Sequence, residues 1–378
     1  MIYYRTSRLA VRGRAREMEM NEQSGGGALR YAVGLSGGVD SSVAALLLKE
    51  QGHAVVGVTM KLWREGVYKG GTRDACFGAH EVEDIATARA LAARLGIDYR
   101  VFDCFDVYNR EVIAYFRDTY LSGRTPNPCV RCNALLKFGL LPRLAQAAGL
   151  AFDRFATGHY ARIVRVGDRL AVARAKDASK DQSYFLYRLT QEQLAKSAFP
   201  LGDYTKAEIR QLAAARGLAV ADRPDSQDFY SGDKNELIGA PDRPGDIVDL
   251  SGRVLGRHNG FWHYTVGQRK GLGIGGGTPF YVVDVNACRN QVIVGRADDA
   301  IRTSLEVTDM VYGALAPDAD GPVPCRVKVR SAGEPKGPAV LCGSRCEFPN
   351  GLAGVAPGQS AVFYAADSDV ILAGGVIR

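Results

Sequence analysis

The stretch Gly34-Leu35-Ser36-Gly37-Gly38-Val39-Asp40-Ser41-Ser42 lies between two apolar runs, residues 31–35 and 43–48. The first run has the character of a strand and the second that of a helix, so the sequence predicts a strand, a glycine turn and a helix start. This arrangement points unpaired backbone N–H groups and the positive end of a helix dipole at one place. The two glycines allow close backbone approach, and the three serines add hydroxyl donors. The stretch therefore predicts a cradle for a pyrophosphate group, and we expect Asp40 to help hold a magnesium ion.

The cradle differs from the common P-loop, because no Gly-Lys-Ser/Thr sequence follows to reach the β- and γ-phosphates. Its pattern, Ser-Gly-Gly-x-Asp-Ser, resembles the PP-loop ATP pyrophosphatase family, whose members cleave ATP between the α- and β-phosphates. The alternative is a helix capped by serine with ordinary glycines nearby. Two glycines flanked by serines directly after a strand favour the pyrophosphate cradle.

Composition sets the limits for the rest of the chain. It has 378 residues, of which 46% are hydrophobic and 24% charged, as in a globular protein of two or three domains. No apolar run approaches the length of a membrane span, so we expect a cytoplasmic protein without membrane association. The formal net charge of +7 permits an RNA partner without requiring one. Residues 1–29 are predicted to form a basic, disordered extension.

Residues 30–222 are predicted to form an α/β domain, because strand-like and helix-like runs alternate. The strand-like runs are 54–60, 99–103 and a short one around Phe155, and the helix-like runs are 81–95, 107–121, 135–148 and 206–216. Such alternation is typical of a parallel sheet with helices on both faces. Ligands of these sheets bind beyond the carboxyl ends of the strands.

A second informative stretch, residues 123–133, contains two prolines followed by Cys129-Val130-Arg131-Cys132 at the start of a helix. Thiols at a helix N-terminus near Arg124 and Arg131 are expected to have a lowered pKa and to be reactive. A redox dithiol, half of a zinc site, a catalytic thiol pair and a purely structural pair remain open at this point.

Two β-rich parts are predicted beyond the α/β domain: a small central domain, residues 223–300, and a C-terminal antiparallel β-barrel, residues 301–378. In the barrel Arg326, Lys328 and Arg330 alternate on one strand face. They predict either contacts with RNA phosphates or an ordinary solvated face.

Five further motifs follow one another along the chain. They are Gly-Arg-Thr-Pro-Asn-Pro with its Cys-Asn and Lys-Phe (123–138), Ala-Thr-Gly-His-Tyr (156–160), Lys-Asp-Gln-Ser-Tyr-Phe-Leu-Tyr (180–187), His-Tyr-Thr-Val-Gly-Gln-Arg-Lys-Gly-Leu-Gly-Ile (263–274) and Pro-Gly-Gln-Ser-Ala-Val-Phe-Tyr (357–364). In this order they resemble the motifs of the tRNA-specific 2-thiouridylase (MnmA) family, a branch of the PP-loop superfamily. With the PP-loop, they cover nearly all of the chain from Gly34 to its C-terminus.

The resemblance implies a sulfurtransferase that uses ATP and Mg²⁺ to adenylate the C2 oxygen of the wobble uridine in a tRNA anticodon stem-loop. A sulfur nucleophile then displaces AMP, and a sulfur-donor or sulfur-relay protein is implied as a partner. Catalysis is expected at Cys132, Cys129 and Asp40. ATP contacts are expected at Gly34, Leu35, Ser36, Gly37, Gly38, Val39, Asp40, Ser41, Met60 and Gly158. Contacts with tRNA are expected at Asn127, Pro128, Cys129, His159, Lys180, Asp181, Gln182 and Gln359, to which the basic strand adds Arg330.

The sequence departs from this family at two positions. Cys129 stands where the best-known members have aspartate, and Tyr230 stands where they have the cysteine that carries a persulfide. Either Cys129 and Cys132 form a relay of their own, or Cys76, Cys129 and Cys132 hold a [4Fe–4S] cluster with one open iron. Cys104 is a weaker fourth candidate ligand. The sequence slightly favours the cluster, although Cys76 alone has the simpler interpretation of a small buried apolar residue.

The sequence thus predicts a tRNA-uridine 2-sulfurtransferase. One alternative is another PP-loop tRNA-modifying ligase, although the chain has no glutaminase-like domain. A second alternative, of a different class, is a non-catalytic tRNA-binding or cluster-sensing protein.

Overall fold

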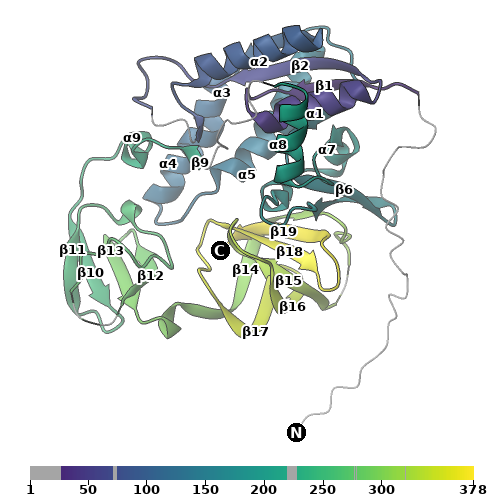
Figure 1. The fold of residues 1–378 in the computed structure, drawn as a ribbon. Helices are drawn as coiled ribbons and strands as arrows, with labels where there is room; N and C mark the ends of the chain where they lie inside the picture. Colours follow the sequence, from purple (N-terminus) through teal and green to yellow (C-terminus); the bar gives the residue numbers. More distant parts are fainter. Residues whose placement is uncertain (1–26, 71–74, 219–227, 276, 278, 320) are drawn as a thin grey trace.

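The computed structural model describes residues 27–378 except 71–74, 219–227, 276, 278 and 320. Most of the predicted N-terminal extension lies outside the described residues, as do residues 225–227, which shortly precede Tyr230. An α/β part lies above two smaller β-rich parts that sit next to each other, as Figure 1 shows. Among the described residues, none of the helices combines the length and apolar character needed to span a bilayer.

The α/β part is built on a five-stranded parallel sheet in the order β4-β2-β1-β5-β8. The strands are β1 (Arg30–Gly34), β2 (Ala54–Lys61), β4 (Asp98–Asp103), β5 (Arg154–Thr157) and β8 (Ser197–Ala198). Alternate residues of β1 face opposite sides, so Val33 packs against one helical layer and Ala32 against the other. The predicted parallel sheet with helices on both faces is confirmed.

One face of this sheet is covered by α1 (Val39–Glu50), α2 (Glu81–Leu95) and α8 (Lys206–Ala215). The other face is covered by a continuous helical run made of α5 (Pro128–Cys132), the π-helical segment η2 (Asn133–Leu140) and α6 (Leu141–Ala147). A second run consists of α3 (Phe105–Tyr108), the π-helical η1 (Asn109–Ile113) and α4 (Ala114–Leu121). These elements lie within a residue or two of most predicted helix bounds. The thiol-bearing helix begins at Pro128, next to the predicted start at Cys129, and the predicted run 135–148 is its continuation.

Smaller elements complete this part of the chain. A hairpin, β6 (Ala161–Val166) and β7 (Arg169–Arg174), is followed by the 3₁₀ turn η3 (Ser183–Leu186) and α7 (Gln191–Ala195). A parallel pair, β3 (Ala75–Phe77) and β9 (Asp228–Tyr230), joins segments that are about 150 residues apart in sequence.

The central part contains a four-stranded sheet in the order β11-β10-β13-β12. Its elements are α9 (Lys234–Ile238), β10 (Gly245–Asp249), β11 (Val254–His258), η4 (Phe261–His263), β12 (Tyr281–Asn286), β13 (Gln291–Gly295) and η5 (Asp298–Ala300). This sheet accounts for the predicted β-rich central part.

The C-terminal part is a closed antiparallel barrel in the order β14-β17-β16-β15-β18-β19. The strands are β14 (Ile301–Tyr312), β15 (Val323–Lys328), β16 (Lys336–Cys342), β17 (Arg345–Ala353), β18 (Ser360–Ala365) and β19 (Ile371–Ile377). The long β14 pairs with β17 in its first half and with β19 in its second half, and register shifts in both pairings bend it. The predicted antiparallel barrel is confirmed.

Candidate active site

The turn that is predicted to cradle a pyrophosphate group lies between β1 and α1. Gly38 is the N-cap of α1 and provides no side chain to bond the first-turn N–H groups, so these donors are left for an anion. Gly37 has φ +77°, and a Cβ there would lie 2.5 Å from the carbonyl oxygen of Asp84 in α2. The Ser36 N–H donates to the Ser41 Oγ over 3.1 Å, which holds the turn. Only glycine allows this turn to pass so close to α2.

The Asp40 carboxylate has two partners that the sequence did not predict. The Lys206 Nζ at the start of α8 donates to both carboxylate oxygens, over 2.7 and 2.9 Å. The Tyr160 hydroxyl donates to the same group over 2.8 Å. The Gly158 backbone also packs here, since a Cβ on it would lie 2.6 Å from the Ser41 nitrogen. The carboxylate expected to help hold magnesium thus forms an ion pair with the ammonium group of Lys206.

The segment after Met60 is fixed by a buried carboxylate. Glu81, which opens α2, accepts hydrogen bonds from the backbone N–H groups of Leu62 (2.6 Å) and Trp63 (2.9 Å). Burial raises the pKa of Glu81 to about 7, although the two N–H donors act in the opposite direction. Met60 itself is half-buried at the carboxyl end of β2.

The Cys-x-x-Cys helix starts as predicted, but its thiols are not acidic. Asn127 is the N-cap of α5 and accepts from the Val130 N–H over 3.3 Å, with Pro128 at the first helical position. Burial raises the pKa of Cys132 to about 12 and raises the pKa of Cys129 even further above its usual range. The expectation of a lowered thiol pKa is therefore wrong.

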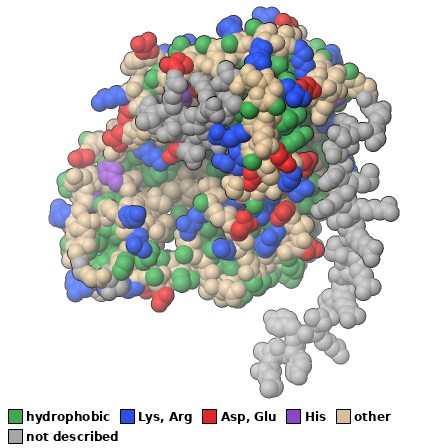
Figure 2. Space-filling model, viewed as in Figure 1, with side chains coloured by type: hydrophobic (Ala, Val, Ile, Leu, Met, Phe, Trp, Pro, Cys, Tyr) green, Lys and Arg blue, Asp and Glu red, His purple; other side chains and the backbone are tan. Residues whose placement is uncertain are grey.

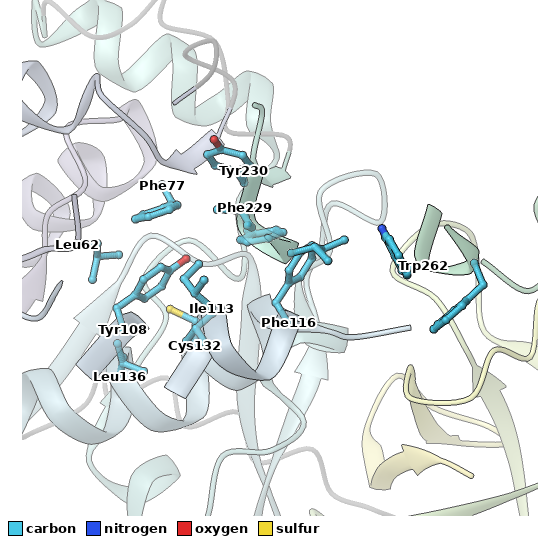
Figure 3. Close-up of a cluster of buried hydrophobic side chains, with 14 of the residues drawn as sticks. Leu62, Phe77, Tyr108, Ile113, Phe116, Cys132, Leu136, Phe229, Tyr230 and Trp262 are labelled. Atoms are coloured by element: carbon cyan, nitrogen blue, oxygen red, sulfur yellow. The ribbon is translucent and has the colours of Figure 1, made fainter. Parts of the chain in front are cut away.

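Two structural features explain this error. The Arg131 side chain is bonded to the carbonyl and carboxylate of Glu111, so its charge is already paired. Apolar and aromatic side chains pack around Cys132, among them Tyr108, Ile113 and Leu136 (Figure 3). Burial in such surroundings disfavours the thiolate more than the helix start favours it.

Cys76 reaches the same region from β3. Its thiol lies 3.8 Å from the Phe229 carbonyl oxygen, which it can reach as a weak donor. Cys76 lies close enough to Cys129 and Cys132 that its thiolate would raise the pKa of both. Cys104 is buried, and burial raises its pKa to about 12. Thiols from two elements, β3 and α5, therefore lie near one another, although no group of described His, Cys, Asp or Glu residues is arranged to hold a metal ion.

Tyr230 closes one side of this thiol region. It is buried on β9, pairs in register with Phe77 of β3, and its ring centroid lies 5.9 Å from that of Phe77. Its hydroxyl donates to the Glu236 carboxylate. Figure 3 shows Tyr230 on the same side of the cluster as Phe77 and Phe229. The residue at the usual cysteine position is thus a packing residue next to the strand that carries Cys76.

Lys137 lies near the three thiols and near His159, which follows β5. Its half-buried ammonium lowers the pKa of all three clustered thiols, though less than burial raises it, and it also lowers the pKa of His159. Burial is the larger cause of the low His159 pKa, so this imidazole is neutral. It shares a hydrogen bond of 2.7 Å with the Thr157 hydroxyl. In the part of the chain that the structure describes, Lys137 forms no ion pair with a carboxylate.

The Lys180-Asp181-Gln182 segment is largely engaged within the protein. The Asp181 side chain is only 1% exposed and pairs with Arg174 over 3.2 Å and Lys328 over 3.8 Å. The Gln182 side-chain oxygen accepts from the Tyr160 N–H. Lys328 is therefore neither on a solvated face nor available to RNA, contrary to both readings of its strand, because the α/β part covers it.

The remaining expected tRNA contacts are exposed to different degrees. Arg330 is exposed and donates to the Ala353 carbonyl over 3.2 Å. Gln359 donates through its side-chain amide to the Pro126 carbonyl over 2.7 Å. On the face shown in Figure 2, Lys and Arg side chains are spread over all three parts and interspersed with Asp and Glu.

Three residues at the candidate site were not singled out from the sequence. The contacts of Lys206 and Tyr160 with Asp40 appear only once α8 and the end of β5 are placed next to the PP-loop, although Tyr160 belongs to the motif 156–160. Lys137 was noted only as part of a motif, and its spacing of five residues from Cys132 would have indicated a position close to that thiol in a π-helical segment.

Comparison with known proteins supports this arrangement. A family model described as "tRNA methyl transferase HUP domain" matches residues 29–230, a "tRNA methyl transferase PRC-barrel domain" matches 238–296, and an "Aminomethyltransferase beta-barrel domain" matches 302–377.

Three relatives are similar over almost their whole length, and each is described as a tRNA-specific 2-thiouridylase. The protein from Endomicrobium trichonymphae is 45% identical over 359 residues, which cover 92% of this chain and 99% of that one. The protein from Geobacter metallireducens is 44% identical, covering 92% and 96%, and the one from Chloroflexus aurantiacus is 46% identical, covering 91% and 97%. The PP-loop, the ordered motifs and these matches agree, and the chain belongs to the tRNA-specific 2-thiouridylase (MnmA) family.

Proposed function

We propose that this chain catalyses ATP-dependent 2-thiolation of the wobble uridine of tRNA, as a sulfurtransferase of the cytoplasm. The observation that carries the proposal is that the predicted pyrophosphate cradle and the thiols both lie beyond the carboxyl ends of the parallel strands. The cradle follows β1 and Cys104 follows β4. Lys137 lies near both Cys132 and His159, which follows β5, because its charge lowers the pKa of each. A nucleotide in the cradle would therefore lie on the same side of the sheet as the thiols.

The reaction has two balanced steps. The C2 oxygen of uridine attacks the α-phosphorus of ATP, the bond to the bridging oxygen of the β-phosphate breaks, and pyrophosphate leaves. A sulfur nucleophile then attacks C2, the bond between C2 and its original oxygen breaks, and AMP departs with that oxygen. The uncapped N–H groups of α1 would stabilise the charge on the phosphates.

Magnesium fits this arrangement less well than the sequence implied. Both oxygens of Asp40 are occupied by Lys206, and a hard divalent cation prefers carboxylate oxygens that are free of an ammonium partner. Asp40 is therefore not proposed as a magnesium ligand. Lys206 is instead placed to balance charge near the phosphates.

For the sulfur route we propose the cluster, because Cys76 of β3 lies near the two thiols of α5 and thiolates are the usual ligands of iron–sulfur clusters. Ligands of a cluster bind different irons, so their sulfurs do not meet at one point as ligands of a single ion do. Cys76, Cys129 and Cys132 would hold the cluster, which would supply an iron able to hold hydrosulfide. Lys137 would then stabilise negative charge on the sulfur near C2.

The second candidate route is a relay between Cys129 and Cys132, favoured by their position within one helical turn. Cys129 is half-buried and Cys132 is buried, so a sulfur-donor protein would deliver sulfur first to Cys129. The proposed tRNA contacts are residues named from the family, Asn127, Pro128, Cys129, His159, Lys180, Gln182 and Gln359, together with the exposed Arg330. The family also implies Asp181, whose carboxylate is buried and paired with Arg174 and Lys328. The flexible, single-stranded anticodon loop suits a protein that must reach an unpaired base.

An assay of sulfur incorporation into unmodified tRNA with ATP and a sulfur source tests the function. We expect 2-thiouridine, AMP and pyrophosphate in equal amounts, and Asp40→Asn and Cys132→Ser should each abolish all thiolation. AMP and pyrophosphate without 2-thiouridine would indicate another PP-loop ligase. Tight tRNA binding without AMP formation would indicate the non-catalytic alternative.

A further inference from the structure

A turn of the C-terminal barrel, residues 356–359, contacts the loop before the thiol-bearing helix. The Gln359 N–H donates to the Ala356 carbonyl over 3.1 Å, which closes the turn. Pro357 occupies its second position and Gly358, with φ +90°, its third, as a type II turn requires. We call residues 356–359 the barrel turn.

The barrel turn binds the backbone of Thr125 and Pro126 at three points. The Thr125 N–H donates to the Pro357 carbonyl over 2.8 Å. The Gln359 side-chain amide donates to the Pro126 carbonyl over 2.7 Å. A Cβ on Gly358 would lie 2.8 Å from the Thr125 carbonyl oxygen, so the two backbones are in direct contact. Thr125 and Pro126 are buried, so without these contacts the Thr125 N–H would be left unpaired at a free-energy cost.

The contact continues into the start of α5. Asn127 is the N-cap of α5, and Ser360 is the first residue of β18. The side-chain nitrogen of Asn127 lies 3.4 Å from the Ser360 hydroxyl and 3.4 Å from the Tyr184 hydroxyl. Tyr184 in turn donates to the Ser360 carbonyl over 3.0 Å. Because α5 has only five residues and carries both Cys129 and Cys132, the groups that fix its first residue also fix its thiols.

We propose that the barrel turn is a clamp that positions the thiol-bearing helix, and that Gln359 is a positioning residue for Cys129 and Cys132. The C-terminal barrel then has a part in the chemistry as well as in the architecture. The catalytic consequence rests on the proposed function, whereas the clamp itself can be tested without it.

The test is thiol alkylation of the full chain, treated with reductant and a metal chelator and followed by tryptic mass spectrometry. Trypsin separates the two thiols, since cleavage after Arg124, Arg131 and Lys137 yields one peptide for Cys129 and another for Cys132. Gln359→Ala removes one bond of the clamp, and we expect alkylation of Cys132 to accelerate about fivefold, as loss of one hydrogen bond predicts. Gly358→Ala should accelerate it more, because its Cβ would push Thr125 away.

Two controls separate loosening of the clamp from general destabilisation. Gly343→Ala places alanine at another positive φ in the same barrel, where a Cβ meets nothing within 4 Å, so it should leave Cys132 alkylation unchanged. Cys346, buried in the barrel core, reports unfolding of the barrel and should react equally slowly in all variants. If Cys132 alkylation does not change in either clamp variant, or rises only in parallel with Cys346, the proposal is overturned.

The functional measurements use the same variants. At saturating tRNA, Gln359→Ala should lower the single-turnover rate of tRNA thiolation several-fold. A raised Kd with unchanged alkylation would identify Gln359 as a tRNA contact and refute the clamp. If the wild-type chain does not thiolate tRNA, only the proposed function fails, because alkylation still decides whether the clamp exists.

Discussion

Glu81→Gln should flatten the dependence of stability on pH. The Glu81 carboxyl is 8% exposed and has a folded-state pKa of about 7, above the ordinary value of 4.5. Because the folded state binds the proton more tightly than the unfolded state, this group stabilises the fold fully below pH 4.5. Its contribution is lost as the pH rises from 4.5 through about 7.

The size of the effect follows from the two pKa values. The full difference corresponds to about 3 kcal/mol, and the part that falls between pH 5 and pH 8 is about 2 to 3 kcal/mol. Glutamine cannot ionise and still offers one oxygen to the N–H groups of Leu62 and Trp63. The variant should therefore lose less stability than the wild type between these pH values, even if it is weaker at pH 5.

Trp63 can report on unfolding, because it is kept in every variant and its backbone N–H donates to the Glu81 carboxylate. Only one other tryptophan, Trp262, is present, so Trp262→Phe in both proteins leaves Trp63 as the sole indole. Urea unfolding followed by its fluorescence at pH 5 and pH 8 measures the change in stability. Glu65→Gln, an exposed carboxylate two residues beyond Trp63, is the matched control. Equal pH dependence in wild type and Glu81→Gln would refute the reasoning.

Three further predictions concern the site and its support. Lys206→Met removes the cation from the PP-loop carboxylate and should weaken ATP binding at least tenfold by calorimetry, as loss of a charge-assisted bond predicts, whereas Lys206→Arg should retain most affinity. Lys328→Met leaves the buried Asp181 carboxylate with one cation fewer and should cost about 2 kcal/mol in urea unfolding; an unchanged midpoint would contradict this. Cys76→Ala should abolish iron and sulfide binding in protein purified without oxygen, and Cys104→Ala should not; iron content unaffected by Cys76→Ala would exclude the three-thiolate cluster.

Local sequence patterns predicted most of the α/β part because its elements are set by local signals. The helix Glu81–Leu95 was predicted to the residue, since acidic residues mark its start and Gly96 its end. The PP-loop was likewise readable, because the turn geometry requires glycine at position 37 whatever surrounds it. The β-rich parts were predicted as classes, while the order of their strands depends on contacts distant in sequence.

The errors share a different physical origin. The pKa of a thiol depends on its burial, and the hydrophobic cluster that contains Cys132 is built from residues as far apart in sequence as Phe77, Tyr108 and Phe229. The alternation of Lys328 with its neighbours correctly separates the two faces of a strand, but it cannot reveal that another domain covers one of them. Lys206 was missed because its charge acquires a meaning only next to Asp40, 166 residues away.

The chemistry of the thiols follows from the same burial. At neutral pH the raised pKa values of Cys129 and Cys132 keep both groups protonated, even with Lys137 nearby, and a protonated thiol is a poor nucleophile. Any sulfur route must therefore bring in something that favours the thiolate. A bound cluster would do so because metal binding displaces the proton, and a relay would do so only if the donor protein or tRNA opened the site to water. The two routes thus predict different responses to added iron: thiolation activity rises if the cluster is used and does not change if the relay is used.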